Sequence, residues 1–289
     1  MMSEANSTLK RNVGILYREE SGTGLIHPFF SLIINAFVEE TKRRGYDMTL
    51  LHHPLEETEE SLADHCRRLG LDGICMVCGE FADPRIRELM TSGFPAVSVD
   101  HIFRGAPAVL SDNETGVRKL VEYAISRGHR RIAMISGHNN SLVTRTRISQ
   151  FKSTMEFHHL PVREEYLKEG LYHDIGGTRE LVKELLSLPE RPTCILLPDD
   201  MTYFGAQEAA RDCNLRIPED ISFAGYDGIP LTQALTPRLT TIRQNCDTMG
   251  TTAAARLIDL IEHPEGASRK PSIYPVELVE GETVAACRA

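Results

Sequence analysis

Tryptophan is absent from this chain of 289 residues, and aromatic side chains make up only 6% of it. No apolar run approaches the ~20 residues that a membrane-spanning helix needs. The first twelve residues, MMSEANSTLKRN, are polar and lack the apolar centre of a signal peptide. These absences argue against a membrane or exported protein, and we expect a soluble protein of the cytoplasm.

Patterns for cofactors, metals and catalysis are also missing. The seven cysteines are scattered and odd in number, which favours reduced thiols over a disulfide framework. The C-x-x-C stretch at 75–78 runs off a strand, so we interpret it as buried thiols. The histidine pairs at 52–53 and 158–159 have no cysteine or carboxylate at ligand spacing. The glycines of "SGTG" at 21–24 fit neither phosphate-binding fingerprint, and no G-x-S-x-G elbow occurs. We expect no cofactor, no metal and no enzymatic activity.

Positive charge is in deficit. The chain has 32 basic against 41 acidic residues, for a formal charge of −9. A surface of this sign repels phosphate backbones, so we do not expect the chain by itself to bind nucleic acid.

Short apolar runs alternate with amphipathic segments along nearly the whole chain. We predict strands at 13–17, 48–52, 73–77, 95–99, 194–198 and 221–225, and a helix followed by a strand within 116–137. We predict the other helices at 28–44, 58–69, 84–92, 144–158, 177–187, 200–213 and 246–262. Continuous apolar strands separated by helices indicate parallel sheets that are covered on both faces. Because the units are too many for one compact sheet, we predict an α/β fold with two doubly wound lobes.

Polar and aromatic residues gather where the predicted strands end. In open α/β sheets, ligands bind beyond these carboxyl ends. The loop after the first strand carries His27 and two phenylalanines, and the loop at 137–147 leads to two arginines. Asp199 and Asp200 follow one later strand, and Tyr226 and Asp227 follow another. Their shared position predicts a binding site at the strand ends.

Each of these residues also has an ordinary structural interpretation. Asp199 is well placed to N-cap a helix starting at Asp200, and Asp112 to cap the helix that follows it. Asp227 lies between glycines, where a turn alone would favour it. The phenylalanines at 29 and 30 suit a core, and the arginines at 145 and 147 suit a solvated helix face. The residues alone leave these alternatives open.

Seven stretches together resemble the effector domain of lac-repressor-type (LacI/GalR) bacterial transcription regulators. They are HPFF (27–30), SDNETG (111–116), GHRRIAMISG (128–137), RISQF (147–151), DDMTYFG (199–205), IPEDISFAGYDGIP (217–230) and LTPRLTTIRQ (235–244). The resemblance implies two Rossmann-like lobes of the periplasmic-binding-protein type, a ligand cleft between them, and three chain crossings near Asp112, Gln244 and Val276. The implied division is a tail or hinge remnant at 1–11, an N-terminal lobe of 12–111 plus 245–275, and a C-terminal lobe of 112–244 plus 276–289.

The resemblance also implies roles for single residues. Phe29 and Phe30 resemble aromatic residues that wall the cleft. Arg147 resembles an arginine that donates a forked pair of hydrogen bonds to the ligand, and Asp227 a carboxylate that accepts from it. Asp199 stands where the family often has Asn. Three further candidates are His27, Tyr203 and Gln244.

The chain departs from the family pattern at two places. Gln150 stands where the family usually has glycine behind the arginine, and EGETVA (280–285) replaces a common Arg-Glu-Ser-Thr sequence. Family members begin with a helix-turn-helix, whereas the first predicted strand here starts at residue 13, after a stretch that resembles the end of a hinge. We therefore expect the sensing and dimerising part of a regulator, which meets operator DNA only through a missing helix-turn-helix.

The expected partners are a small effector and a second copy of the chain. A sugar or sugar derivative is the favoured effector, and a nucleobase stays open. The main alternative is a periplasmic sugar-binding transport protein, which has the same two-lobed fold but requires an export signal. An α/β enzyme is a further alternative and requires a nucleophile or a cofactor loop.

Overall fold

The computed structural model of the chain describes residues 11–17, 27–51, 60–79 and 81–287. The chain forms two compact units, Met1–Leu110 with Cys246–Tyr274 and Ser111–Asn245 with Pro275–Ala289. It therefore passes from one unit to the other three times. Residues 1–10 of the tail expected at 1–11, the SGTG glycines and the histidine pair at 52–53 lie outside the described residues.

The first unit is built on a six-stranded sheet with the strand order β11-β5-β4-β3-β1-β2. Its strands are β1 (Asn12–Tyr17), β2 (Asp47–Leu51), β3 (Gly73–Cys78), β4 (Ala96–Val99), β5 (Ala108–Ser111) and β11 (Ser272–Tyr274). The pairs β1–β2, β1–β3, β3–β4 and β4–β5 are parallel.

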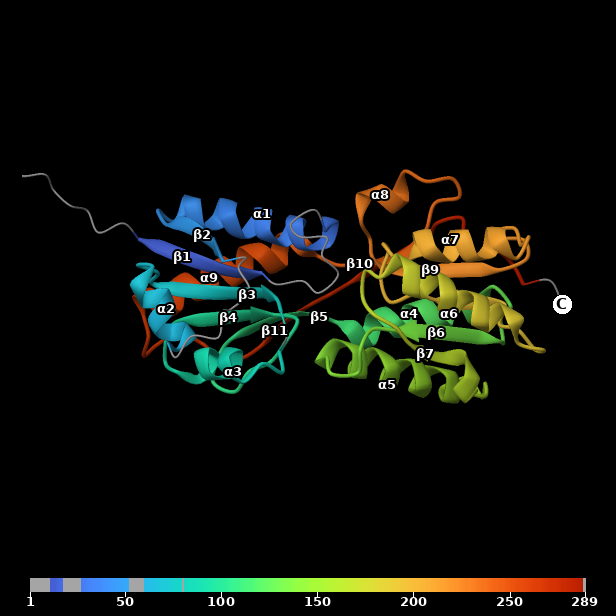
Figure 1. The fold of residues 1–289 in the computed structure, drawn as a ribbon, viewed down its shortest axis with the longest axis horizontal. Helices are drawn as coiled ribbons and strands as arrows, with labels where there is room; N and C mark the ends of the chain where they lie inside the picture. The colour runs from blue at the N-terminus through green and yellow to red at the C-terminus, as the bar shows by residue number, and fades with distance from the viewer. Residues whose placement is uncertain (1–10, 18–26, 52–59, 80, 288–289) are drawn as a thin grey trace, which may run out of the picture. The chain divides into compact units, whose positions relative to one another are not determined.

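Helices cover both faces of this sheet (Figure 1). They are α1 (Pro28–Arg43), α2 (Leu62–Arg68), α3 (Pro84–Thr91) and α9 (Cys246–Glu262). Helices α1 and α9 pack together, while α2 and α3 share a core cluster that contains Ile74 and Met76 of β3. Alternate residues of a strand point to opposite faces, so a strand between two helical layers must be apolar throughout. This explains the unbroken apolar run of β3.

The second unit has its own six-stranded sheet, ordered β12-β10-β9-β8-β6-β7. Its strands are β6 (Ile132–Ser136), β7 (Leu167–Glu169), β8 (Cys194–Leu196), β9 (Ser222–Asp227), β10 (Thr240–Arg243) and β12 (Glu277–Val279). All the neighbouring pairs are parallel except β10–β12, which is antiparallel.

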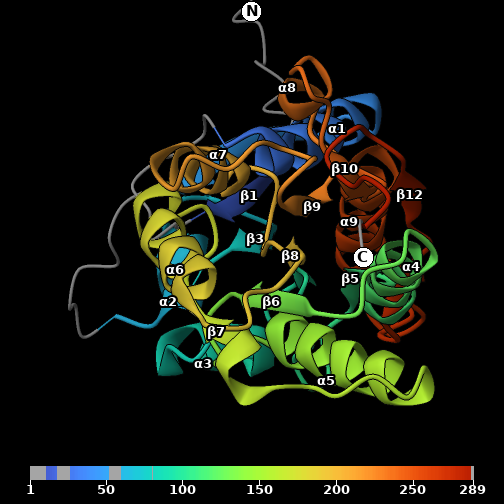
Figure 2. The same cartoon turned by 90° about the vertical axis from the view of Figure 1, so that its right-hand side faces the viewer.

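In this unit α4 (Asn113–Ser126) and α5 (Leu142–Phe157) cover one face of the sheet, and α6 (Ile175–Ser187) and α7 (Tyr203–Asp212) cover the other (Figure 2). A short helix, α8 (Pro230–Gln233), follows β9. Two core clusters result. Cys194 and Leu196 of β8 face the α4–α5 layer, and Ile195 between them faces the α6–α7 layer.

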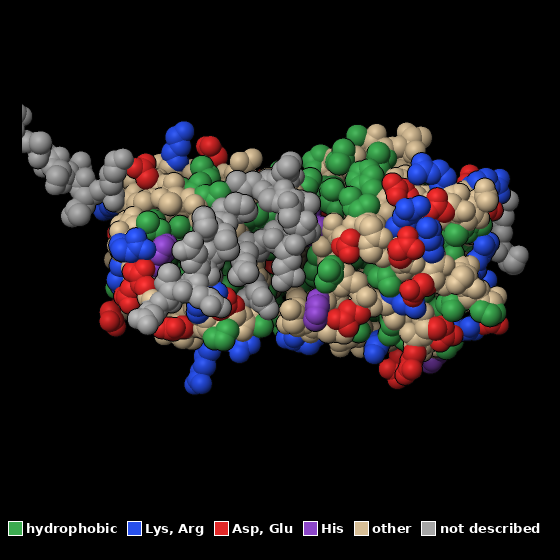
Figure 3. Space-filling view, in the orientation of Figure 1, with side chains coloured by type: hydrophobic (Ala, Val, Ile, Leu, Met, Phe, Trp, Pro, Cys, Tyr) green, Lys and Arg blue, Asp and Glu red, His purple; other side chains and the backbone are tan. Residues whose placement is uncertain are grey.

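The surface over α6 and α7 carries acidic and basic side chains next to one another (Figure 3). Arg179 and Lys183 of α6 both pair with Asp212 of α7. Because exposed ion pairs contribute little to stability, the helices are held mainly by the buried cores beneath them.

The prediction of an α/β fold with two doubly wound lobes is confirmed. Some details of the predicted elements differ. Helix α7 begins at Tyr203, three residues later than expected, and β9 continues through Tyr226 and Asp227 instead of ending at residue 225. Five short strands were not predicted, namely β5, β7, β10, β11 and β12. Within the described part of the chain, no helix is both long and apolar enough to cross a membrane.

Candidate functional site

Arg147 lies on the inner face of α5 and is buried. Its Nε donates to Asn113 Oδ1 at 2.8 Å, and its Nη1 donates to the carbonyl oxygen of Pro198 at 2.9 Å. Its guanidinium lies 3.5 Å from the ring centroid of Tyr226. Arg145, two residues earlier, is exposed. The solvated-face interpretation therefore holds for Arg145 but is wrong for Arg147.

Asp227 is the last residue of β9 and is also buried. Its Oδ1 accepts a hydrogen bond of 2.7 Å from Nε2 of Gln244, which follows β10 and is buried as well. The backbone of Asp227 has a φ of 118°, a value that residues with a side chain rarely adopt. Burial, together with the nearby carboxylates of Asp199 and Asp200, raises its pKa well above the usual value. Strained backbone of this kind concentrates at ligand sites.

Asp199 follows β8, and the structure shows what its carboxylate does. Oδ1 accepts from the backbone N–H of Thr202 at 2.9 Å, and Oδ2 accepts from the N–H of His173 at 2.8 Å. The imidazole Nδ1 of His173 lies 3.5 Å from the same Oδ2. Burial acts to raise the pKa of Asp199, but the charge and hydrogen bonds of His173 outweigh it and lower the pKa. Asp199 thus makes a capping-type hydrogen bond in the turn before α7, but it is not the N-cap of a helix that starts at Asp200, because α7 begins at Tyr203 and Thr202 is its N-cap.

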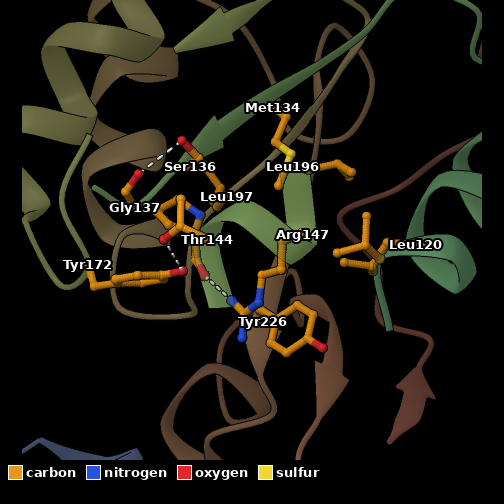
Figure 4. Close-up of a pocket in the computed structure, with 12 residues that line it drawn as sticks. Leu120, Met134, Ser136, Gly137, Thr144, Arg147, Tyr172, Leu196, Leu197 and Tyr226 are labelled. Atoms are coloured by element: carbon orange, nitrogen blue, oxygen red, sulfur yellow. Dashed lines mark hydrogen bonds between the residues drawn. The ribbon is translucent and has the colours of Figure 1, made fainter. Parts of the chain in front are cut away.

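A small pocket opens in the second unit beside Arg147 (Figure 4). Tyr172 forms one wall, and its hydroxyl lies 3.0 Å from Thr144 Oγ1. Tyr226 forms another wall, and apolar side chains of α4, β6 and β8 complete the lining. Burial raises the pKa of Tyr172, which keeps the phenol neutral. Arg147 lies on the helix after β6, Pro198 follows β8 and Tyr226 belongs to β9. The contacts of Arg147 with the other two therefore connect the carboxyl ends of these strands.

Three residues of this arrangement were not among the predicted site residues, namely Asn113, Tyr172 and His173. Tyr172 and His173 lie in the loop after β7, and because this strand was not recognised, nothing in the sequence marked the loop as a strand end. Asn113 directly follows Asp112, the residue predicted to cap α4. A signal for it existed in the SDNETG stretch, which the family resemblance already included.

Asp112 does act as a cap, because its Oδ1 accepts from the N–H of Thr115 at 3.0 Å at the start of α4. Loss of an N-cap costs about 1 kcal/mol. We expect Asp112→Ala to lower the free energy of unfolding by this amount in chemical denaturation, while effector affinity stays unchanged. A larger loss of affinity than of stability would show that Asp112 contributes to the site itself.

Tyr203 lies apart from the other residues predicted for this unit. It is fully buried in the core beneath α6 and α7, where its ring meets Phe223 edge to face with 6.3 Å between centroids. Because α7 begins at this residue, its side chain points from the first turn of the helix into the sheet. The structure therefore does not bring Tyr203 to Arg147 and Asp227.

The remaining predicted residues belong to the first unit and are described within it. His27 immediately precedes α1 and is buried, Phe29 is buried, and Phe30 is half-buried. The Phe30 ring lies within 5.5 Å of the rings of His27, Phe29 and Tyr17, centroid to centroid. This makes an aromatic cluster at the carboxyl end of β1. Phe81, after β3, and His101, after β4, form a second aromatic contact. Their rings stack in parallel with 4.3 Å between centroids.

The cysteines of the C-x-x-C stretch lie on β3, Cys75 buried and Cys78 half-buried. Burial raises the pKa of the Cys75 thiol, so it stays protonated. Among the residues that the structure describes, no group of three or more His, Cys, Asp or Glu side chains is placed to hold a metal ion.

A chain that forms two doubly wound sheets and passes three times from one unit to the other defines a protein of the periplasmic-binding type. Residues 121–284, more than half of the chain, match the family described as periplasmic binding protein-like domain. The chain is 30% identical over 263 residues to the HTH-type transcriptional repressor PurR of Escherichia coli, covering 89% of this chain and 76% of the repressor. It is 29% identical over 290 residues to the ribose operon repressor of Escherichia coli K12, covering 97% and 87%.

A regulatory protein of the LacI family from Chloroflexus aggregans has the same fold. Its crystal structure superposes with a TM-score of 0.83 at 26% identity, covering 94% of this chain and 98% of that one. The chain belongs to the LacI family of transcriptional regulators, as the sequence motifs predicted.

Proposed function

We propose that this chain senses a small polar effector, and that the effector contacts Arg147 and Asp227 in the second unit. The observation that carries the proposal is that these two buried groups lie near enough for the charge of Arg147 to act on the carboxyl of Asp227. One is a buried donor with several N–H groups, the other a buried acceptor, and each is held in place by other side chains. A ligand whose rim carries both donors and acceptors satisfies such a pair. Sugars have this property at every hydroxyl, and nucleobases have it along one edge.

The aromatic cluster of the first unit gives the proposal a second part. Aromatic faces suit the C–H faces of a sugar or the plane of a base, so we propose His27, Phe29 and Phe30 as further effector contacts. We propose Gln244 as the residue that orients Asp227, and Asp199 as a group that supports the same loop. Binding, not turnover, is the proposed activity, in keeping with relatives that are repressors.

A thermal-shift screen tests the proposal. D-ribose is the first probe because one relative is a ribose operon repressor, and other sugars and purine bases follow. A ligand at 100 times its Kd stabilises a protein by about 2.7 kcal/mol, which is readily detected. Calorimetry then gives the affinity of each hit. Stabilisation by a sugar supports the favoured class of effector, and stabilisation by a purine base supports the nucleobase class. If Arg147→Lys and Asp227→Asn leave the stabilisation by the ligand unchanged, the assigned site is wrong.

Asp227→Asn distinguishes an effector contact from a turn residue. Asparagine suits the same backbone, but it replaces one acceptor oxygen of the ionised carboxylate with a donor, so the affinities are compared at a pH above the raised pKa of Asp227. We expect effector affinity to fall at least about tenfold, the usual effect of leaving one polar group badly paired. Asp220→Asn, at a surface residue paired with Arg216, is the matched control. Equal affinity of the Asp227→Asn and control proteins in calorimetry would restore the turn interpretation.

We also propose that the chain forms a homodimer and that effector binding changes the operator affinity of a helix-turn-helix segment. Two of the named relatives are repressors, one of them HTH-type by name, and such proteins read pseudo-palindromic operators as twofold dimers. We expect light scattering to give twice the chain mass of 32.3 kDa. A monomer at micromolar concentration would contradict the dimer and leave the effector proposal intact.

A further inference from the structure

Tyr226 has a contact with Arg147 that its place in the sequence does not explain. The residue is the penultimate one of the buried strand β9, with Gly225 before it and Asp227 after it, where a turn requires no aromatic ring. In the structure its ring lies face-on beneath the guanidinium, with 3.5 Å between Arg147 Cζ and the ring centroid. Both side chains are buried. A desolvated cation on an aromatic face gains about 2 kcal/mol.

The ring and the hydrogen bonds of Arg147 constrain different motions. A guanidinium is planar, and its five N–H groups point outward in that plane. The bonds from Nε to Asn113 and from Nη1 to Pro198 fix how the group is rotated within the plane. They leave it able to tilt about the line that joins them. The face of Tyr226, 3.5 Å from Cζ, opposes the tilt more closely than the ring of Tyr172, whose centroid lies 5.8 Å from Cζ.

Helix α4 provides the room for this ring. A side-chain carbon at Gly116 would lie 2.2 Å from the Tyr226 hydroxyl oxygen and 2.9 Å from the ring carbon Cζ, closer than atoms approach without a shift. Gly116 lies one turn after Asn113, on the same face of α4. The first turn of one helix therefore supplies both an acceptor for Arg147 and the space for the ring beneath it.

We propose that Tyr226 is a positioning residue for Arg147, and that Gly116 is the glycine that admits it. The ring holds the guanidinium in the orientation in which it meets the effector. The orientation itself is independent of any ligand, whereas its effect on affinity rests on the proposed function. The two can therefore fail separately.

The orientation is tested without a ligand by NMR of protein labelled with 15N-arginine. The Nε–H signal of Arg147 is assigned by its loss in Arg147→Lys. In the wild type and in Tyr226→Phe, which keeps the ring, we expect an upfield ring-current shift and slow hydrogen exchange. In Tyr226→Leu we expect the shift to shrink to what the Tyr172 ring, 5.8 Å from Cζ, can cause, and exchange to accelerate about thirtyfold, the factor that corresponds to the ~2 kcal/mol of a desolvated cation–π contact. An unchanged signal in Tyr226→Leu would overturn the proposal.

Stability tests the role of Gly116. Gly116→Ala is expected to lower the melting temperature clearly in the wild type, because the new methyl group meets the Tyr226 ring. In the Tyr226→Leu background the same substitution is expected to have little effect, since the ring and hydroxyl are gone. Equal destabilisation in both backgrounds would show that Gly116 does not serve to admit the ring.

Affinity for any hit of the screen supplies the last test. Tyr226→Leu is expected to weaken effector binding about tenfold, and Tyr226→Phe to leave it nearly unchanged. In a protein that already carries Arg147→Met, adding Tyr226→Leu is expected to cause no further loss of affinity. Additive losses in this cycle would mean that Tyr226 acts on the effector directly and not through Arg147. If the NMR result holds but the Arg147 substitutions leave affinity unchanged, the proposed function is wrong and the positioning role stands.

Discussion

Arg147→Lys is expected to weaken effector binding by about 1.5–3 kcal/mol, or roughly ten- to a hundredfold in Kd, the range for hydrogen bonds to charged groups. Lysine keeps the charge but is a point charge on a flexible stem. It cannot donate to Asn113 and Pro198, lie flat on Tyr226 and present a planar pair of donors at the same time. Charge alone is therefore insufficient at this position.

Arg145→Lys is the matched control for this experiment, because Arg145 lies on the same helix two residues away. It is exposed, and its Nη1 donates to the carbonyl oxygens of Asn139 and Asn140. Calorimetry on both variants compares the same chemical change at a buried and at an exposed position. Affinity that is unchanged in Arg147→Lys, or equally reduced in both variants, would remove Arg147 from the site.

The long elements of the fold are predictable because each carries a local pattern. Strands β1, β3 and β9 are unbroken apolar runs, since helices cover both faces of their sheets. The five missed strands are only three or four residues long, and strands this short carry no period of their own. Strand β10 reads TTIR and β12 reads ELV, and each becomes a strand only because a partner strand lies beside it.

The candidate site is less predictable, and Asp199 and Tyr203 show why. The sequence predicts a helix that starts at residue 200 behind Asp199, and Tyr203 is a site candidate only through the family resemblance. In the structure, the carboxylates of Asp199 and Asp200 form bonds that replace a first helical turn, and α7 begins at Tyr203. A shift of three residues changes which way a side chain points. Grouping residues by strand end correctly places Arg147 near Tyr226 and Asp227. Gln244, a candidate from the resemblance, bonds to Asp227, and the contacts of these residues with an effector stay predictions.

Asp200 illustrates a side chain whose role only the three-dimensional contacts reveal. It is fully buried, and three segments converge on its carboxylate. Oδ2 accepts from the N–H of Ile229 at 2.9 Å and from Thr232 Oγ1 at 3.0 Å, while Oδ1 lies 2.5 Å from Thr241 Oγ1. The residue thus ties the end of β8 to the start of α8 and to β10.

Asp200→Ala is expected to lower the free energy of unfolding by about 3–5 kcal/mol, because it leaves several buried polar groups without their acceptor. Chemical denaturation followed by circular dichroism measures the loss. Asp259→Ala, which removes an exposed carboxylate beside His263, is the control and should change stability little. A loss at position 200 no larger than that of the control would show that the three bonded groups find other partners.

Asp200→Asn is expected to differ from Asp200→Ala, because burial and the neighbouring Asp199 raise the pKa of Asp200 to about 7. In the unfolded chain the same carboxyl ionises near 3.8, its ordinary value. Its contribution to stability is therefore complete below about pH 4 and is lost as the pH rises through about 7. An asparagine at this position keeps an acceptor oxygen for the N–H of Ile229 and the hydroxyl of Thr232 and has no charge to bury, although its amide nitrogen cannot accept the hydrogen bond that Thr241 Oγ1 donates to Oδ1. Denaturation at pH 5 and pH 8 should show a smaller loss of stability at the higher pH for Asp200→Asn than for the wild type. Asp199 and Asp227 titrate in both proteins, and because the charge of Asp200 raises the pKa of Asp227, the difference between the proteins reports Asp200 together with this coupling. Equal pH dependence would mean that Asp200 is ionised throughout this range.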